Sequence, residues 1–208
     1  MQALRDRHQT PALPILISGC IGPRGDGYIA DTAMTPAAAE AYHVAQIATF
    51  VETGVDMVSA ITMTNAAEAT GIARAAQRMG VPPVISFTVE TDGRLPSGQA
   101  LGAAIAEVDA ATGAAPAYYM INCAHPTHYE AILTGNPDWT LRLGGMRANS
   151  SMLSHAELND AVDLDRGDPV DLGRRYGALR AQLPQLRVLG GCCGTDHQHV
   201  AQIAAACA

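Results

Sequence analysis

Apolar runs alternate with amphipathic segments along the whole chain. The runs are continuous rather than alternating, as expected for strands that are buried on both faces of a parallel sheet. Strands that alternate with helices pair in parallel through right-handed crossovers, so the pattern predicts an α/β protein with six strand–helix units. The predicted strands are residues 13–20, 55–63, 81–89, 117–123, 141–146 and 188–189, the last leading into glycines.

Capping residues mark the starts and ends of the helices between these runs. Thr35 before Pro36 has the pattern of a helix start, and Ser154 with Glu157 has capping-box spacing. Six such units fit either an open doubly wound sheet or six-eighths of a (β/α)8 barrel, and the pattern alone leaves both open. Predicted helices begin after Thr35, Asn65, Ser97, Ser154, Asp168 and Asp196, and the first three end at Gly54, Gly80 and Gly113.

Composition narrows the class of protein. The chain has 208 residues, of which 48% are hydrophobic, so we expect a single domain over residues 1–208. Its net charge of −7 argues against nucleic-acid binding, which usually needs a basic patch. No apolar run approaches the ~20 residues that span a bilayer, and the N-terminus lacks the form of a signal peptide. We therefore expect a cytoplasmic protein without a membrane partner.

Three of the five cysteines fall where predicted strands end. Cys123 closes one apolar run, and Cys192 and Cys193 follow another through Gly190 and Gly191. The carboxyl ends of parallel strands share one rim, so we expect the three thiols to converge there. Glycines permit the turn that lets adjacent side chains reach one ion. Three thiolates with an open fourth position are typical of a catalytic Zn²⁺ site.

Other interpretations of these residues stay open at this point. An odd number of cysteines without framework spacing favours metal binding or reactivity over structural disulfides, although the three-thiol set could also serve a redox role. Cys20 and Cys207 are expected to act as small buried hydrophobic residues. Four histidines beside predicted helix starts could add metal ligands: His125, His128, His197 and His199.

With these residues assembled, the chain resembles the homocysteine S-methyltransferase family. The family's Gly-Gly-Cys-Cys-Gly signature occurs at residues 190–194, and its Asn-Cys pair occurs at Asn122-Cys123. Residues 18–23, 65–69, 86–88 and 147–150 are similar to further family segments. The resemblance implies a (β/α)8 TIM-barrel type of fold, present here as six strand–helix units without the first two.

The resemblance also implies a function. Zinc held by Cys123, Cys192 and Cys193 would take the sulfur of homocysteine as its fourth ligand. An unperturbed thiol has a pKa of ~8.5, so zinc coordination is what would provide a thiolate near neutral pH. The thiolate would accept methyl from a cationic donor of the betaine, S-methylmethionine or S-adenosylmethionine type, giving methionine. Candidate substrate-binding residues are Asn122, Thr88 and Asn149, whereas Asp196 is expected mainly to cap its helix.

Two departures from the family pattern bear on this interpretation. The chain begins at a segment resembling the tail of the second helix, so we expect an upstream segment or an oligomer to complete the barrel. Ile61 stands where many relatives carry a glutamate, which leaves the acceptor open. Alternatives are a zinc lyase or hydrolase that uses metal-bound water, with Glu90 and Asp92 as candidate bases, and a non-catalytic zinc-binding paralogue.

Overall fold

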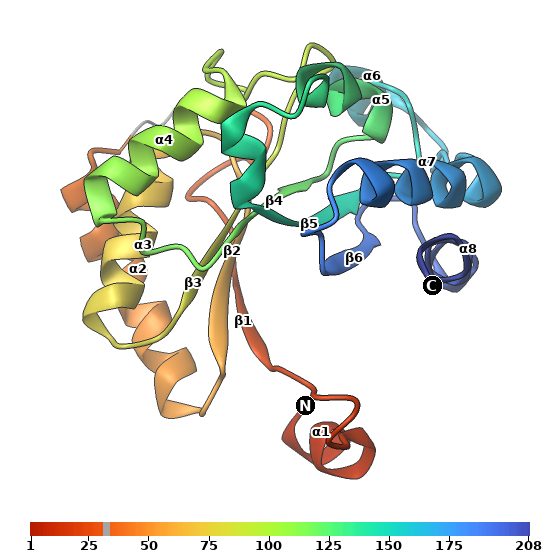
Figure 1. The fold of residues 1–208 in the computed structure, drawn as a ribbon. Coiled ribbons are helices and arrows are strands. Elements are labelled where there is room, and N and C mark those ends of the chain that lie inside the picture. The colour runs from red at the N-terminus through yellow and green to blue at the C-terminus, as the bar shows by residue number, and fades with distance from the viewer. Residues whose placement is uncertain (31–33) are drawn as a thin grey trace.

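The strands form one parallel sheet that curls around an open concave face (Figure 1). The structure is a computed structural model that describes residues 1–30 and 34–208. Each strand pairs with the next one in the chain, whereas a doubly wound sheet reverses its order at a switch point. The predicted barrel type is therefore confirmed as a partial barrel. The strands are β1 (Ser18–Ile21), β2 (Met57–Met63), β3 (Pro83–Phe87), β4 (Tyr119–Asn122), β5 (Leu143–Ala148) and β6 (Val188–Gly191).

Helices cover the convex side of this sheet (Figure 1). Among the described residues, no helix is both long enough and apolar enough to cross a membrane. The longer helices are α2 (Pro36–Glu52), α3 (Ala66–Arg78), α4 (Leu101–Thr112), α7 (Pro169–Gln182) and α8 (His197–Cys207). Shorter ones are α1 (Gln2–His8), α5 (Pro126–Tyr129), α6 (His155–Asp160) and the 3₁₀ turns η1 (Glu130–Leu133) and η2 (Asp138–Arg142).

The predicted capping residues start most of these helices. The side chains of Thr35, Asn65, Ser154, Asp168 and Asp196 each accept a backbone N–H of the following first turn. The helix expected after Ser97 begins only at Leu101, because a turn over Gly98 comes first. Its N-cap, Ala100, has no oxygen in its side chain to accept a bond.

The apolar core lies between the helices and the convex face of the sheet. All five residues of β3 are buried, as the continuous apolar run predicts for a central strand. Phe87 of β3 stacks on Tyr119 of β4 with ring centroids 6.1 Å apart. Helices α2 and α3 pack closely, since an added Cβ at Gly71 would lie 2.6 Å from both the Glu40 nitrogen and the Pro36 carbonyl oxygen.

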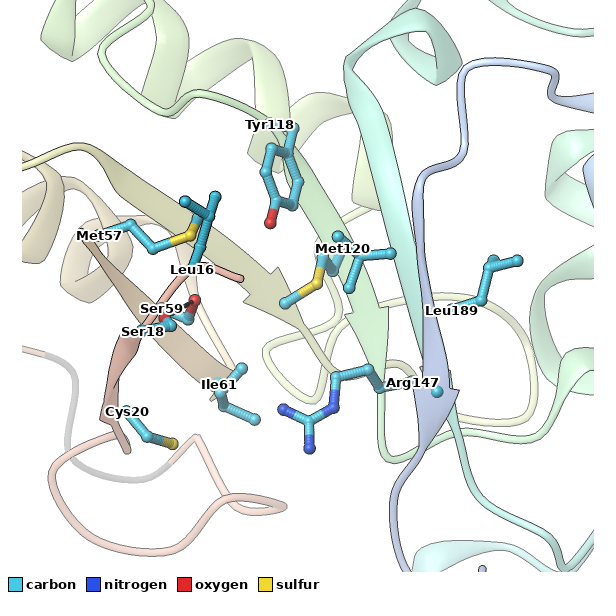
Figure 2. A pocket seen from close by; sticks show the side chains of 12 residues that line it. Leu16, Ser18, Cys20, Met57, Ser59, Ile61, Tyr118, Met120, Arg147 and Leu189 are labelled. Carbon is cyan, nitrogen blue, oxygen red and sulfur yellow. Dashed lines mark hydrogen bonds between the residues drawn. The ribbon is translucent and has the colours of Figure 1, made fainter. Parts of the chain in front are cut away.

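The concave face is not filled like the convex one. Within residues 1–30 and 34–208, β1 pairs only with β2 and β6 only with β5, so each end strand keeps one free edge. Between them a cavity of about 350 Å³ opens, lined by inward residues such as Ser59, Ile61, Met120 and Arg147 (Figure 2). Cys20, expected to be buried, is exposed here because the inner side of edge strand β1 has no packing partner in the described structure.

Gly71→Ala should destabilise the fold, because the new methyl group meets backbone atoms of α2 that cannot rotate away. We expect the free energy of unfolding to fall by about 1–3 kcal/mol, measured by urea denaturation. Gly22→Ala is the control, since a Cβ there meets no atom within 4 Å. Equal stability of the Gly71→Ala and wild-type chains would contradict the close helix contact.

Candidate metal centre

Strand β5 brings the three cysteines together. Cys123 directly follows β4, and Cys192 and Cys193 directly follow β6. The Cys123 amide donates to the Arg147 carbonyl at 3.1 Å, and the Cys192 amide donates to the Ala148 carbonyl at 2.8 Å. Both cysteines thus extend the ladders on either side of β5. Their sulfurs and that of Cys193 all lie within 4.8 Å of one another, so the convergence expected from the sequence is present.

The chemistry of these sulfurs and their convergence at one rim fit a zinc ion. Two sulfurs on one tetrahedral zinc lie roughly 3.8 Å apart, since each Zn–S bond is about 2.3 Å. Burial differs among the three residues: Cys123 is buried, Cys192 is half-buried and Cys193 is exposed. The cluster is therefore reached from the Cys193 side, where a fourth ligand would enter.

Cys123 and Cys192 are joined as a disulfide in this structure, and Cys193 is free. The cysteine pattern of the sequence favours metal binding or reactivity over a structural disulfide, so this bond was not predicted. Its physical reason is the strand register, which holds the two Cα atoms 5.5 Å apart, within the usual range for a disulfide. A disulfide between these two sulfurs would exclude metal binding by them, because metal binding requires thiolates.

Two left-handed residues shape the backbone under the cluster. Cys123 has φ of 54° and Thr62, at the end of β2, has φ of 62°, although neither is a glycine. The Thr62 hydroxyl lies 3.8 Å from the Cys123 sulfur. Such conformations cost energy, and they persist when the surroundings hold them in place. Here the support comes from Asn122, whose Oδ1 accepts the Thr62 amide at 2.9 Å and whose Nδ2 donates to the Thr62 hydroxyl at 2.8 Å.

Asn149 connects the two cysteine segments. Its Nδ2 donates to the Cys123 carbonyl at 3.0 Å, and its Oδ1 accepts the Cys193 amide at 3.1 Å. The side chain is buried, so water competes little for these bonds. Asn149 therefore fixes the spacing between the two strand ends that carry the sulfurs.

Tyr28 and His155 contact the cysteine segments, and Glu90 contacts His155; of these three residues the sequence suggested a role only for Glu90. The Tyr28 hydroxyl lies 3.8 Å from the Cys193 sulfur, and its ring packs on His155 with centroids 4.1 Å apart. Burial, followed by the neighbouring Cys193, raises the pKa of Tyr28 far above its usual value, so the hydroxyl stays protonated. His155 contacts the Cys123 carbonyl through Nε2 at 2.6 Å and Glu90 through Nδ1 at 3.2 Å.

The loop that carries Tyr28 is anchored far from the cluster. The buried Glu68 carboxylate accepts the Arg24 amide at 2.7 Å and contacts His43 Nε2 at 2.8 Å. Both Glu68 and His43 are 2% exposed, so this pair is shielded from solvent. Helices α2 and α3 thereby hold the beginning of the loop that reaches Cys193.

The other residues that the sequence suggested for the site differ in their burial and hydrogen bonding. Asn122 is fully buried and also accepts the Ser86 hydroxyl, so its amide is largely used within the sheet. Thr88 follows β3, and its buried hydroxyl has no hydrogen-bond partner among the described residues. Asp92 lies in a turn, where it accepts the Arg94 amide. Asp196 caps α8 as expected, and its bonds with His199 lower its pKa to about 2.

The histidines considered as ligands stand outside the sulfur cluster. His199 contacts Asp196 and the Arg166 carbonyl, and His128 contacts the Met152 carbonyl. His125 contacts Thr127, and burial is the main cause that lowers its pKa to about 4. The group that could hold a metal within the described part of the chain contains only the three cysteines.

Comparisons with known proteins agree with this geometry. The family model described as homocysteine S-methyltransferase matches residues 1–207. The homocysteine methyltransferase MmuM from Escherichia coli is similar in its oxidized form, with 20% identity, a TM-score of 0.74, and 98% of this chain and 65% of that chain covered. Its metallated form gives a TM-score of 0.71 at the same identity and coverage.

These structural matches show the fold, since their identity is 20%. The apo form of MmuM is also similar, with a TM-score of 0.68 and 20% identity over 99% of this chain and 67% of that chain. The chain thus spans about two thirds of the length of MmuM. A search of curated proteins gave no match.

Asn149→Ala should weaken metal binding, because it frees both cysteine segments at once. We expect the zinc affinity of the reduced chain to fall at least about tenfold, as for other residues that support metal ligands. Competition with a chromophoric chelator measures the affinity. Asn159→Ala, on the exposed face of α6, is the matched control. An unchanged zinc affinity in Asn149→Ala would show that Asn149 does not support the metal ligands.

Proposed function

Since the chain belongs to the homocysteine S-methyltransferase family, we propose that it transfers a methyl group from a cationic donor to the thiol of homocysteine. The proposed site is a zinc ion held by Cys123, Cys192 and Cys193. The observation that carries the proposal is the convergence of three sulfurs within 4.8 Å of one another at the carboxyl ends of β4 and β6. Active sites of barrel enzymes lie at this face.

The donor set suits the reaction. Thiolates select zinc over magnesium or calcium, and three protein ligands leave one position for a substrate. When bound, zinc would lower the pKa of the substrate thiol and so supply a thiolate near neutral pH. Exposed Cys193 marks the side from which this fourth ligand arrives, whereas buried Cys123 closes the opposite side.

The surrounding residues prepare the site without entering the reaction. Asn149 fixes the distance between the strand ends, and Asn122 holds Thr62 against the Cys123 sulfur. Methyl transfer from a cation to a thiolate neutralises charge, so a site shielded from water favours it. Tyr28 and His155 pack together beside Cys193 and border the side from which the substrate would enter. Direct substrate contacts by Asn122, Thr88 or Asn149 belong to the same proposal.

The thiol state of the site sets a condition on activity. The Cys123–Cys192 disulfide must be reduced before both sulfurs can bind zinc. MmuM has been solved in oxidized and metallated forms, which is in keeping with two states of such a site. We therefore place the active protein in a reducing compartment such as the cytoplasm.

The open sheet edges suggest how the barrel is completed. The chain covers 65% of MmuM, and β1 and β6 each keep a free edge within the described residues. Exposed parallel edges are usually covered in folded proteins. We propose that further strand–helix units, from the same polypeptide or from a second copy, pair with these edges.

Removal of one thiol tests the metal site. The reduced wild-type chain should bind about one zinc per chain, and Cys193→Ser should lose most of it, because two thiolates and a water bind zinc far more weakly. Atomic emission after dialysis measures the zinc content. Cys20→Ser, which lies outside the sulfur cluster, should bind zinc like wild type. Equal zinc in wild type and Cys193→Ser would show that Cys193 is not a ligand.

Product analysis tests the reaction itself. The zinc-loaded chain should form methionine from homocysteine with S-methylmethionine, S-adenosylmethionine or betaine, and Cys193→Ser should lower the rate by at least about 100-fold. Mass spectrometry of the products identifies the donor that is used. A chain that holds zinc but methylates no thiol with any of these donors would be a zinc-binding protein without this activity.

A further inference from the structure

His155 connects four segments that follow strands at the rim. Its Nε2 contacts the carbonyl of Cys123, after β4, at 2.6 Å, and its Nδ1 contacts the carboxylate of Glu90, after β3, at 3.2 Å. Its ring packs on Tyr28, from the loop after β1, with centroids 4.1 Å apart. His155 itself begins α6, in the segment after β5. The residue is 8% exposed, so these contacts are made largely away from water.

The contact with Cys123 has a defined direction. A carbonyl oxygen can only accept a hydrogen bond, so the ring nitrogen Nε2 of His155 donates it. The same carbonyl accepts Asn149 Nδ2 at 3.0 Å, and the Cys123 amide donates to the Arg147 carbonyl at 3.1 Å. Both peptide groups of Cys123 are therefore held, although its φ of 54° lies in the left-handed region. Holding both peptide groups sets the direction in which the sulfur points.

The imidazole of His155 is itself held from two sides. The Ser154 side chain accepts the Glu157 amide, and the Glu157 carboxylate accepts the Ser154 amide at 2.8 Å. This reciprocal capping box fixes the backbone where α6 begins. At the other side of the ring, the Glu90 carboxylate restricts ring rotation, as carboxylates do for histidines that bind metals. Nε2 therefore stays directed at the Cys123 carbonyl.

We propose that His155 is a positioning residue that holds the sulfur of Cys123 in the geometry of a metal ligand, and that Glu90 acts by orienting His155. The proposal rests on the proposed function where it takes Cys123 as a zinc ligand. It gives Glu90 a role other than that of the general base considered from the sequence, because the carboxylate faces an imidazole nitrogen. It also links Tyr28 to the cluster, since Tyr28 packs on the ring that holds Cys123.

Three substitutions of His155 separate its contacts. His155→Gln places an amide N–H near the position of Nε2 and can keep the bond to Cys123. His155→Asn reaches only to the position of Nδ1, and His155→Phe keeps a ring against Tyr28 but donates no bond. The matched control is His8→Gln, on the exposed surface of α1.

The zinc affinity of the reduced chains should follow the bond to Cys123. We expect His155→Phe and His155→Asn to bind zinc at least about tenfold more weakly than wild type in competition with a chromophoric chelator, because the carbonyl loses a donor. His155→Gln should restore most of the affinity, and His8→Gln should bind zinc like wild type.

Two results of this comparison would overturn the positioning role. One is wild-type zinc affinity in His155→Phe. The other is an equal loss of affinity in His155→Gln and His155→Phe, accompanied by an equal fall in the melting temperature of the zinc-free chains, which would make His155 a purely structural residue.

Substitutions of Glu90 test the second half of the proposal. Glu90→Gln keeps an oxygen that can accept from His155, so its zinc affinity and its rate of methyl transfer should stay within about tenfold of wild type. Glu90→Ala should weaken zinc binding, as His155→Phe does, because the ring is no longer oriented. Unchanged zinc affinity in Glu90→Ala would overturn the orienting role. A rate loss of about 100-fold or more in zinc-loaded Glu90→Gln would identify a general base instead.

A measurement without zinc separates this proposal from the metal chemistry. In the reduced, zinc-free, ¹³C-labelled chain, the carbonyl ¹³C signal of Cys123 should move upfield in His155→Phe, because the carbonyl loses a hydrogen bond, and should stay near its wild-type position in His155→Gln. If the wild-type chain binds no zinc but shows this pattern, the metal site is refuted while His155 remains the residue that positions Cys123. An unmoved signal in His155→Phe would overturn the proposal.

Discussion

The structure of the site depends on backbone hydrogen bonds to a single strand. The carbonyls of Arg147 and Ala148 on β5 accept the amides of Cys123 and Cys192 from the two sides. Parallel strands must end at the same rim when their ladders are in register, so these bonds place sulfurs from distant segments within reach of one ion. The strand register sets the positions of the cysteines, and Asn149 and the loop bearing Tyr28 add side-chain contacts to them.

That arrangement costs energy locally, and the surrounding polar network offsets the cost. Left-handed Thr62 and Cys123 depart from the ordinary strand conformation. The buried amides of Asn122 and Asn149 hold these two residues in place with hydrogen bonds. Polar groups buried in this way must be satisfied, so each amide is tied to one specific geometry of its cysteine segment.

The sequence was sufficient for features that depend on local chemistry. Continuous apolar runs located the strands, and Asn65, Ser154 and Asp196 marked helix starts that the structure retains. Strand-end positions also predicted that the three cysteines converge. The extended start of α4 was missed because the turn over Gly98 delays a helix whose capping residue the pattern placed at Ser97.

Features that arise from contacts between distant segments could not be predicted in this way. Tyr28 lies 165 residues from Cys193 in the chain, and no local pattern links the two. The roles of Thr62 and His155 likewise depend on how loops fold over the rim. Cys20 is exposed because the concave face is open. The apolar strand pattern predicted burial on both faces, and it contains no information on whether a partner covers the inner face.

The strand order has a consequence for the order of folding. Each strand pairs with its neighbour in the chain, so most of the sheet can grow through contacts between adjacent strand–helix units. The cysteines are the exception, because 69 residues separate Cys123 from Cys192. They meet only after β5 and β6 have docked, which makes the sulfur cluster one of the last parts of the chain to assemble. A ligand that binds all three sulfurs would therefore stabilise the folded carboxyl-terminal half, because it binds only after that half has assembled.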